Sequence, residues 1–352
     1  MITGTYLLLA FFGGIFATCL GALGSVIICA FVVLAGVCAV MAGCDFNIVT
    51  TFAFGFGLSP HLGLGPAACA LTYAWKKGLV EDGKGIAMPL MLLGKPSVLI
   101  VGGIFAALSY CINIGLGAVL PGKIDSISAS IVIIGIISKL IWGDEGIFGK
   151  VPNDDKRFGV FSKNNWMPHM PFGNGVYYWL FAGSVGFLSS WIYWEISEYA
   201  KAQGSDLIAS VAMFPMFAFA VIFLILLCCG LPCPIFHHVG LSSCYGAMMA
   251  YAAGQSEITV LLWGMAAGII SHFVADILAD VFLVYGGGYV DPPSLSMTIC
   301  SLVYWIVFPV LGLYNGTIGI ITPVVLLVLT GGFALFVQSK RNKAIKNNLE
   351  IA

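Results

Sequence analysis

Stretches of about 20 predominantly apolar residues recur from one end of the sequence to the other, and a helix of that length spans a bilayer. Charged residues make up 9% of the chain, against roughly 25% in soluble proteins, and the mean hydropathy is +1.01. A membrane β-barrel would show short segments of alternating polarity instead. We therefore expect an all-α polytopic membrane protein, embedded in the lipid bilayer of a bacterial cytoplasmic membrane.

About 11 transmembrane helices are predicted, of which one, at the C-terminal end, lies outside the repeat described below. The segment 44–59 is apolar but rich in Gly and Thr, and it is short for a span. Non-helical backbone at membrane depth is tolerated only inside protein or along a cavity, so we expect a re-entrant turn or the unwound part of a broken helix. The predicted spans are 5–22, 24–43, 60–76, 96–118, 126–143, 174–196, 206–229, 236–253, 257–286, 294–313 and 316–338.

Basic residues are distributed unevenly between the two sides of the predicted membrane. An odd number of spans puts the two termini on opposite sides. With the N-terminus outside, only Lys123 and Lys201 of the fifteen Lys and Arg residues fall outside. Cytoplasmic loops are the ones enriched in Lys and Arg, so the bias predicts an N-out, C-in orientation.

A short pattern occurs twice, in Pro60–Leu64 and in His237–Leu241, and both copies follow a Pro- and Gly-containing break. The predicted orientation makes the spans that follow them run in opposite directions. A second register aligns 102–110 with 264–272 and places Asn113 one position from the equivalent of Asp276. Together these matches predict a 5+5 inverted repeat with interrupted helices. The expected divisions are a first repeat at 1–143, a cytoplasmic inter-repeat loop at 144–173, a second repeat at 174–313, an extra helix at 314–338 and a basic tail at 339–352.

Two interrupted helices of opposite direction would bring two helix N-termini to the middle of the membrane. The N–H groups and the partial positive charge of such ends favour a small polar or anionic solute. The alternative is that the small residues only let helices pack closely. The expected solute-binding residues are Ser59, His61, Gly63, Gly65, His237, His238, Gly240, Ser242 and Ser243.

Ionisable residues inside predicted spans are the second functional signal, because their burial in a bilayer is costly. A spacing of four places His272, Asp276 and Asp280 on one helix face. Such a row suits a coupling Na⁺ or H⁺, and a divalent metal is the alternative. Beyond Na⁺, no cofactor is expected. The expected coupling-ion residues are Asp45, Asn113, His272, Asp276 and Asp280.

These features predict an ion-coupled secondary transporter rather than an enzyme. The alternatives are a passive channel for a solute such as ammonium or urea, and a membrane-embedded metal-dependent enzyme. In span count and orientation the predicted architecture is similar to that of ammonium channels, although the pore histidines of that family lie on the fifth and tenth spans rather than the third and eighth. No basic face is present for nucleic acid, and the last span is free to pack against a second copy in a homo-oligomer.

Overall fold

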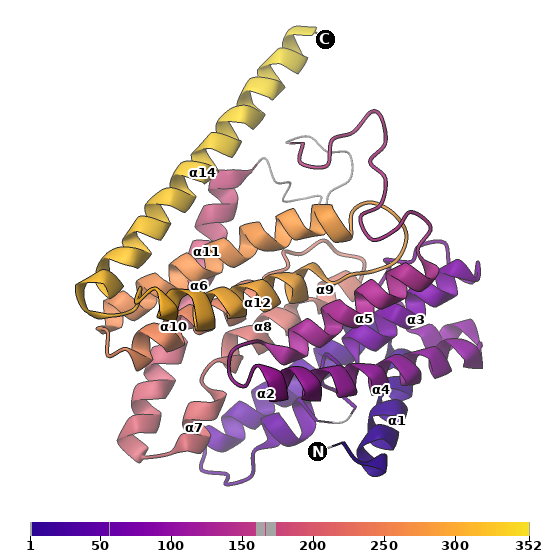
Figure 1. Ribbon diagram of the computed structural model, residues 1–352, viewed down its shortest axis with the longest axis horizontal. Helices are drawn as coiled ribbons and strands as arrows, with labels where there is room; N and C mark the ends of the chain where they lie inside the picture. The colour runs from indigo at the N-terminus through magenta and orange to yellow at the C-terminus, as the bar shows by residue number, and fades with distance from the viewer. Residues whose placement is uncertain (1, 56, 160–165, 167–173, 352) are drawn as a thin grey trace.

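The computed structural model describes residues 2–55, 57–159, 166 and 174–351, and the regular secondary structure of these residues is helical throughout (Figure 1). Residues 160–165 and 167–173 of the predicted inter-repeat loop lie outside the described residues. The first half contains α1 (Gly4–Leu20), α2 (Ala22–Met41), the π-helical turn η1 (Val49–Ala53), α3 (Leu64–Lys76), the 3-10 turn η2 (Leu90–Leu93), α4 (Pro96–Val119) and α5 (Ser126–Trp142). The second half contains α6 (Gly175–Gln203), α7 (Asp206–Val211), α8 (Phe214–Phe223), α9 (Ile225–Cys228), α10 (His237–Ala252), α11 (Glu257–Phe282), α12 (Pro292–Leu302), η3 (Val303–Val307), α13 (Phe308–Val310) and α14 (Gly316–Ile351).

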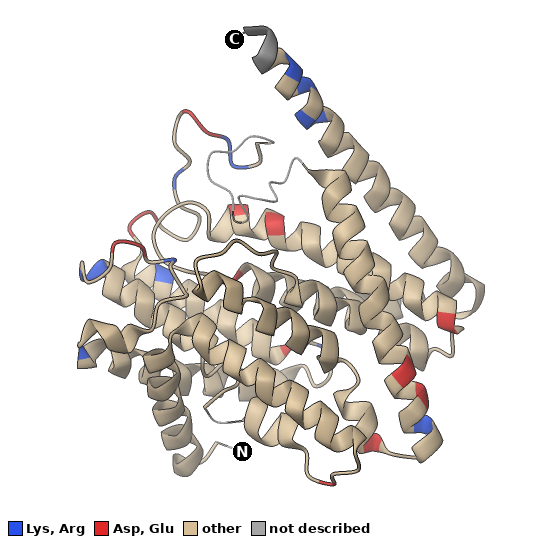
Figure 2. Ribbon diagram, turned by 180° about the vertical axis from the view of Figure 1, so that it is seen from behind, with Lys and Arg blue, Asp and Glu red and all other residues tan. Residues whose placement is uncertain are grey.

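Several of these helices are long and apolar enough to cross a membrane, which confirms the prediction of an all-α chain with membrane-spanning character. Figure 2 shows most charged residues toward two ends of the bundle, with a broad, largely uncharged band between them. The helices α1 and α5 are apolar as well but shorter. The six candidate spans among the described residues are Ala22–Met41, Pro96–Val119, Asp206–Cys228, Glu257–Phe282, Pro292–Val310 and Gly316–Asn347.

Each half contains one close crossing of two long helices at paired glycines. In the first half, α1 packs along α4, and a Cβ on Gly14 would lie 2.8 Å from the carbonyl oxygen of Gly102. In the second half, α6 packs along α11, and a Cβ on Gly186 would lie 2.8 Å from the carbonyl oxygen of Gly264. The absence of side chains therefore lets both pairs of backbones approach closely, as in other membrane helix pairs.

Gly102→Ala is expected to destabilise the protein by about 1–3 kcal/mol, because the new methyl group would overlap the side chain of Thr18 on α1. Gly115 lies on the same helix with open space around its Cβ position, and Gly115→Ala removes a poor helix former. Thermal unfolding in detergent should show a lower midpoint for the first variant and an unchanged or higher one for the second. Equal midpoints for the two variants would show that this crossing is not tightly packed.

The helices α5 and α12 run antiparallel where the two halves meet. The start of α5 lies beside the end of α12, and the residues just before α12 lie beside the middle of α5. The backbone N–H of Asp125 donates to Ser301 Oγ at 2.9 Å. A Cβ on Gly135 would lie 3.3 Å from the carbonyl oxygen of Tyr289. Residues at the start of one helix thus meet residues about nine positions into the other.

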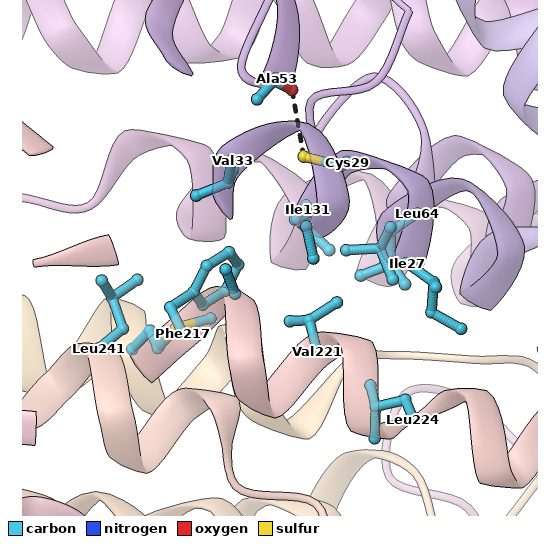
Figure 3. Close-up of a cluster of buried hydrophobic side chains, with 14 of the residues drawn as sticks. Ile27, Cys29, Val33, Ala53, Leu64, Ile131, Phe217, Val221, Leu224 and Leu241 are labelled. Atoms are coloured by element: carbon cyan, nitrogen blue, oxygen red, sulfur yellow. Dashed lines mark hydrogen bonds between the residues drawn. The ribbon is translucent and has the colours of Figure 1, made fainter. Parts of the chain in front are cut away.

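The helices α2 and α7–α9 form a second antiparallel pair between the halves. Asn47, just after α2, donates its side-chain amide to Ser210 on α7 at 3.3 Å. At the other end of the pair, Leu23 and Leu227 line one cavity. Figure 3 shows the apolar side chains between these ends, with Ile27 and Val33 of α2 on one side and Phe217, Val221 and Leu224 on the other.

Both α3 and α10 follow stretches of irregular backbone. The segment predicted to be re-entrant or unwound contains η1, and turns then lead to α3; Cys29 donates its thiol to the carbonyl oxygen of Ala53 at 3.1 Å. Residues 229–236 before α10 are likewise outside any helix. The 13 residues of α3 rise about 20 Å, less than the roughly 30 Å of a bilayer core.

The last helix, α14, lies outside the rest of the bundle (Figure 1). It packs on α6 and α11, and most of its membrane-length part is exposed. The helix continues well past the predicted end at residue 338, because the polar residues that follow are compatible with a helix beyond the apolar stretch.

Candidate functional site

Two cavities of about 500 Å³ and about 250 Å³ lie between the two halves of the chain. They share Val26 of α2, Leu64 of α3, His237 of α10 and Asp291, which precedes α12. Each half therefore contributes two of the four shared residues. The cavities adjoin at this point, which we call the junction.

The two cavities extend toward opposite ends of α5. The smaller cavity is lined by Ser126 and Ser128 at the start of this helix. The larger one is lined by Val284, in the loop held by Lys139 near the other end of the helix. Because α5 has 17 residues, its two ends are about 25 Å apart. Together the cavities follow the interface between the halves over much of the bundle's depth.

A carboxylate on each half lines the smaller cavity and caps the N-terminus of a helix. Asp125 accepts hydrogen bonds from the backbone N–H of Ser128 at 3.0 Å and from the Ser128 hydroxyl at 2.5 Å. The hydroxyl of Tyr245, on α10, donates to the same carboxylate at 2.7 Å. An Asp at the N-cap complements the positive end of α5.

Asp291 has the same environment at the start of α12. It accepts from the backbone N–H and the hydroxyl of Ser294 at 2.9 and 2.5 Å, and from the hydroxyl of Tyr289 at 2.8 Å. The side chain is 5% exposed. Neither Asp125 nor Asp291 has an ion pair within the described part of the chain.

Sequence reasoning missed both of these carboxylates, although a signal was present. Asp125 and Asp291 each begin the pattern Asp-x-x-Ser-x-Ser immediately before a predicted span. One such pattern alone is typical of a helix N-cap. Its occurrence before two predicted spans of opposite direction was the signal that the two carboxylates are related. Their position beside the cavity depends on how α5 and α12 pack.

Three basic residues hold the C-terminal end of α11 beside the larger cavity. The amine of Lys139 donates to the carbonyl oxygen of Phe282 at 2.6 Å, and Lys84 donates to that of Val284 at 3.0 Å. Arg157 donates to the backbone carbonyl of Asp280 at 2.7 Å. Positive charge at this position complements the helix dipole and satisfies the last carbonyls. Burial lowers the pKa of the Lys84 amine, and the carboxylates of Asp82 and Glu145 oppose that shift.

A buried polar cluster lies next to the junction, among α6, α10 and α11. His238 Nε2 is 3.3 Å from His272 Nδ1, and the two rings stack with centroids 5.4 Å apart. The ring of Tyr178 lies 4.6 Å from that of His272, and its hydroxyl donates to Asp276 Oδ1 at 3.4 Å. His238, His272 and Tyr178 are fully buried, and Asp276 is 5% exposed.

Several atoms of this histidine–aspartate cluster have no hydrogen-bond partner among the described residues. They are His238 Nδ1, His272 Nε2 and Asp276 Oδ2. The neighbouring His237 faces the junction, and its Nδ1 is also without a partner in the part of the chain that the structure describes. The adjacent positions 237 and 238 therefore connect the cavity to the cluster. Unsatisfied buried polar atoms are costly, so this arrangement calls for a functional explanation.

Of the predicted solute-binding residues, the structure places His237 at the junction and most others in contacts between helices. His61 forms a 2.6 Å hydrogen bond with Ser59, and both are buried. The glycines face side chains of neighbouring helices. The remaining predicted positions are Gly63 against Ser25, Gly65 against Ile131 and Ile134, Gly240 against Met216, Ser242 bonded to Ser271, Ser243 bonded to Val239, and His238 in the cluster.

The predicted coupling-ion residues are divided among three places. His272 and Asp276 belong to the cluster, and Asp280 is buried one turn farther along α11. Asn113 is half-buried in α4, and no described residue forms a hydrogen bond with its Oδ1; Asp45 is exposed after α2. Within the described residues, no group of three His, Cys, Asp or Glu side chains is arranged to hold a metal ion.

Comparison with known proteins places the chain in a family without assigning it an activity. The model of DUF7973, a family of unknown function, matches residues 1–167 and 201–322. The chain belongs to this family. No curated protein and no solved structure matches it.

Proposed function

We propose that this member of DUF7973 is an ion-coupled secondary transporter of a small polar solute, working by alternating access. The observation that carries the proposal is the junction, where cavities from opposite ends of the bundle adjoin between the two halves. A binding site at such an interface is exposed to one side or the other when the halves rock. The shared residues Leu64 and His237 are placed to contact the solute in either state.

We also propose that the chain consists of two inverted repeats of five spans, with α14 as the eleventh span. Three observations support this arrangement. The crossing of α1 on α4 corresponds to that of α6 on α11, with Gly14 and Gly102 matching Gly186 and Gly264. The pairs α2 with α7–α9 and α5 with α12 are antiparallel, as an axis in the membrane plane requires. The capped carboxylates Asp125 and Asp291 are equivalent in this alignment.

A proton is the coupling ion that the buried cluster supports best. Asp276 lies among aromatic and histidine rings, and its described polar partner is the hydroxyl of Tyr178. Uptake of a proton neutralises such a buried carboxylate, whereas a bound cation requires several oxygen ligands. Because His238 adjoins His237, protonation of the cluster is able to respond to a solute at the junction.

Uptake into proteoliposomes tests this proposal. Small cationic, neutral and anionic solutes are first screened by thermal stabilisation of the purified protein. The best is then offered with a pH gradient, a Na⁺ gradient or neither. We expect accumulation against a concentration gradient only when the pH gradient is imposed. Accumulation driven by a Na⁺ gradient alone would show that Na⁺, and not the proton, is the coupling ion. Rapid equilibration without any gradient would identify a passive channel.

A further inference from the structure

We propose that the smaller cavity binds a small organic cation. The inference rests on the proposed function and names the chemical class of its solute. It departs from the anionic solute that two converging helix N-termini would favour. The helices that begin beside this cavity, α5 and α12, are not the two interrupted helices of that prediction, and each already has a negative partner at its N-terminus, in Asp125 and Asp291.

The charge of the cavity lining is the first argument. Asp125 and Asp291 line it, and its described lining contains no Lys or Arg. Each carboxylate accepts three hydrogen bonds and lies at the N-terminus of its helix, α5 or α12. Two carboxylates therefore line one cavity without a paired cation in the described chain. A cationic ligand supplies the missing charge, and an anion would be repelled.

The aromatic side chains around the cavity are the second argument. Five aromatic residues line it, in addition to His237. The faces of Trp, Tyr and Phe attract ammonium groups, most strongly where water is excluded. The aromatic residues are Phe54, Phe214, Phe217, Tyr245 and Trp305.

The volume of the cavity limits the size of the ligand. At about 250 Å³ it lies below the roughly 300–1,000 Å³ typical of pockets for drug-sized molecules. A metabolite-sized amine or quaternary ammonium compound suits this space. Two carboxylates around an aromatic-lined cavity do not form a cage of oxygen ligands for a bare metal ion, and no metal-holding group is present among the described residues.

Equilibrium binding to the full-length protein in detergent tests the inference. The probes are choline, ethanolamine, the neutral choline isostere 3,3-dimethylbutan-1-ol and the anion 3,3-dimethylbutanoate. We expect choline or ethanolamine to bind and stabilise the protein, and the neutral and anionic compounds to bind at least about tenfold more weakly. Asp125→Asn and Asp291→Asn should each weaken binding of the cation by about tenfold or more.

These substitutions remove charge without removing the helix caps, because Asn is as good an N-cap as Asp. Thermal unfolding without ligand checks that both variants remain folded. Glu257→Gln is the matched control, since Glu257 is an exposed carboxylate in the first turn of α11, away from the cavity lining. Its affinity should equal that of the unmodified protein. Trp305→Leu tests the aromatic contribution separately, with an expected loss of about threefold to tenfold.

Equal or tighter binding of the neutral isostere would overturn the inference, as would unchanged cation binding in both Asp variants. The proposed function is tested separately by transport. If the neutral or anionic probe binds instead and is accumulated in response to a pH gradient, the proposed transport function is supported and the proposed cationic ligand is rejected. If choline binds but no probe crosses the membrane, the proposed cation site is supported and the proposed transport function is rejected.

Discussion

Asp276→Asn is expected to abolish uptake driven by a pH gradient, a loss on the order of 100-fold, as for other positioned proton-transferring side chains. Asparagine keeps the size of the side chain and accepts a hydrogen bond from Tyr178, but it cannot take up or release a proton at physiological pH. Exchange of labelled for unlabelled solute across the membrane does not require net proton movement. This exchange should continue in the variant.

The two assays together separate coupling from binding. Uptake and exchange are measured in the same proteoliposomes, with the best ligand from the stabilisation screen. Glu257→Gln changes a carboxylate at the opposite end of the same helix and should affect neither rate. Normal pH-driven uptake by Asp276→Asn would rule out a coupling role for this residue.

Leu64→Trp is expected to reduce uptake to background, because the larger ring would fill the junction shared by the two cavities. Leu64 is the first residue of α3, and it lines both cavities. The added volume therefore enters the cavities more than the packed core. Val26→Trp, from the neighbouring helix α2, should have the same effect for the same reason.

Leu64→Ala is the control for this experiment. It widens the junction instead of closing it, so pH-driven uptake should persist. Gel filtration and thermal unfolding establish that the Trp variants are folded. Undiminished uptake by both Trp variants would show that the solute takes a different route through the protein.

Most helix boundaries could be predicted from the sequence because their ends carry local signals. The span predicted at 96–118 is α4, which begins with Pro96, and the span predicted at 126–143 is α5, which follows the N-cap Asp125. The largest differences are in helices that continue past the apolar stretch. The helix α6 was predicted to end at residue 196 and extends to Gln203, because its last turns are amphipathic and reach Lys201.

The candidate site was less predictable because it depends on contacts between distant segments. Adjacent residues of a helix point about 100° apart, which is why His237 faces the cavity while His238 meets His272. The sequence motif alone does not distinguish these two histidines. Asp125 and Asp291 look like ordinary caps at the membrane surface until the antiparallel packing of α5 and α12 brings Asp125 to Ser301 and the residues before α12 to Gly135.

Accessibility of the junction from the two sides of the membrane tests the central claim most directly. Leu64→Cys is made in a protein whose eleven native cysteines have been replaced, and a membrane-impermeant thiol reagent is applied from each side in turn. Alternating access predicts labelling from both sides, with rates that change in opposite directions when the pH of one side is changed. Labelling from one side under all conditions, or rates that rise and fall together, would contradict it.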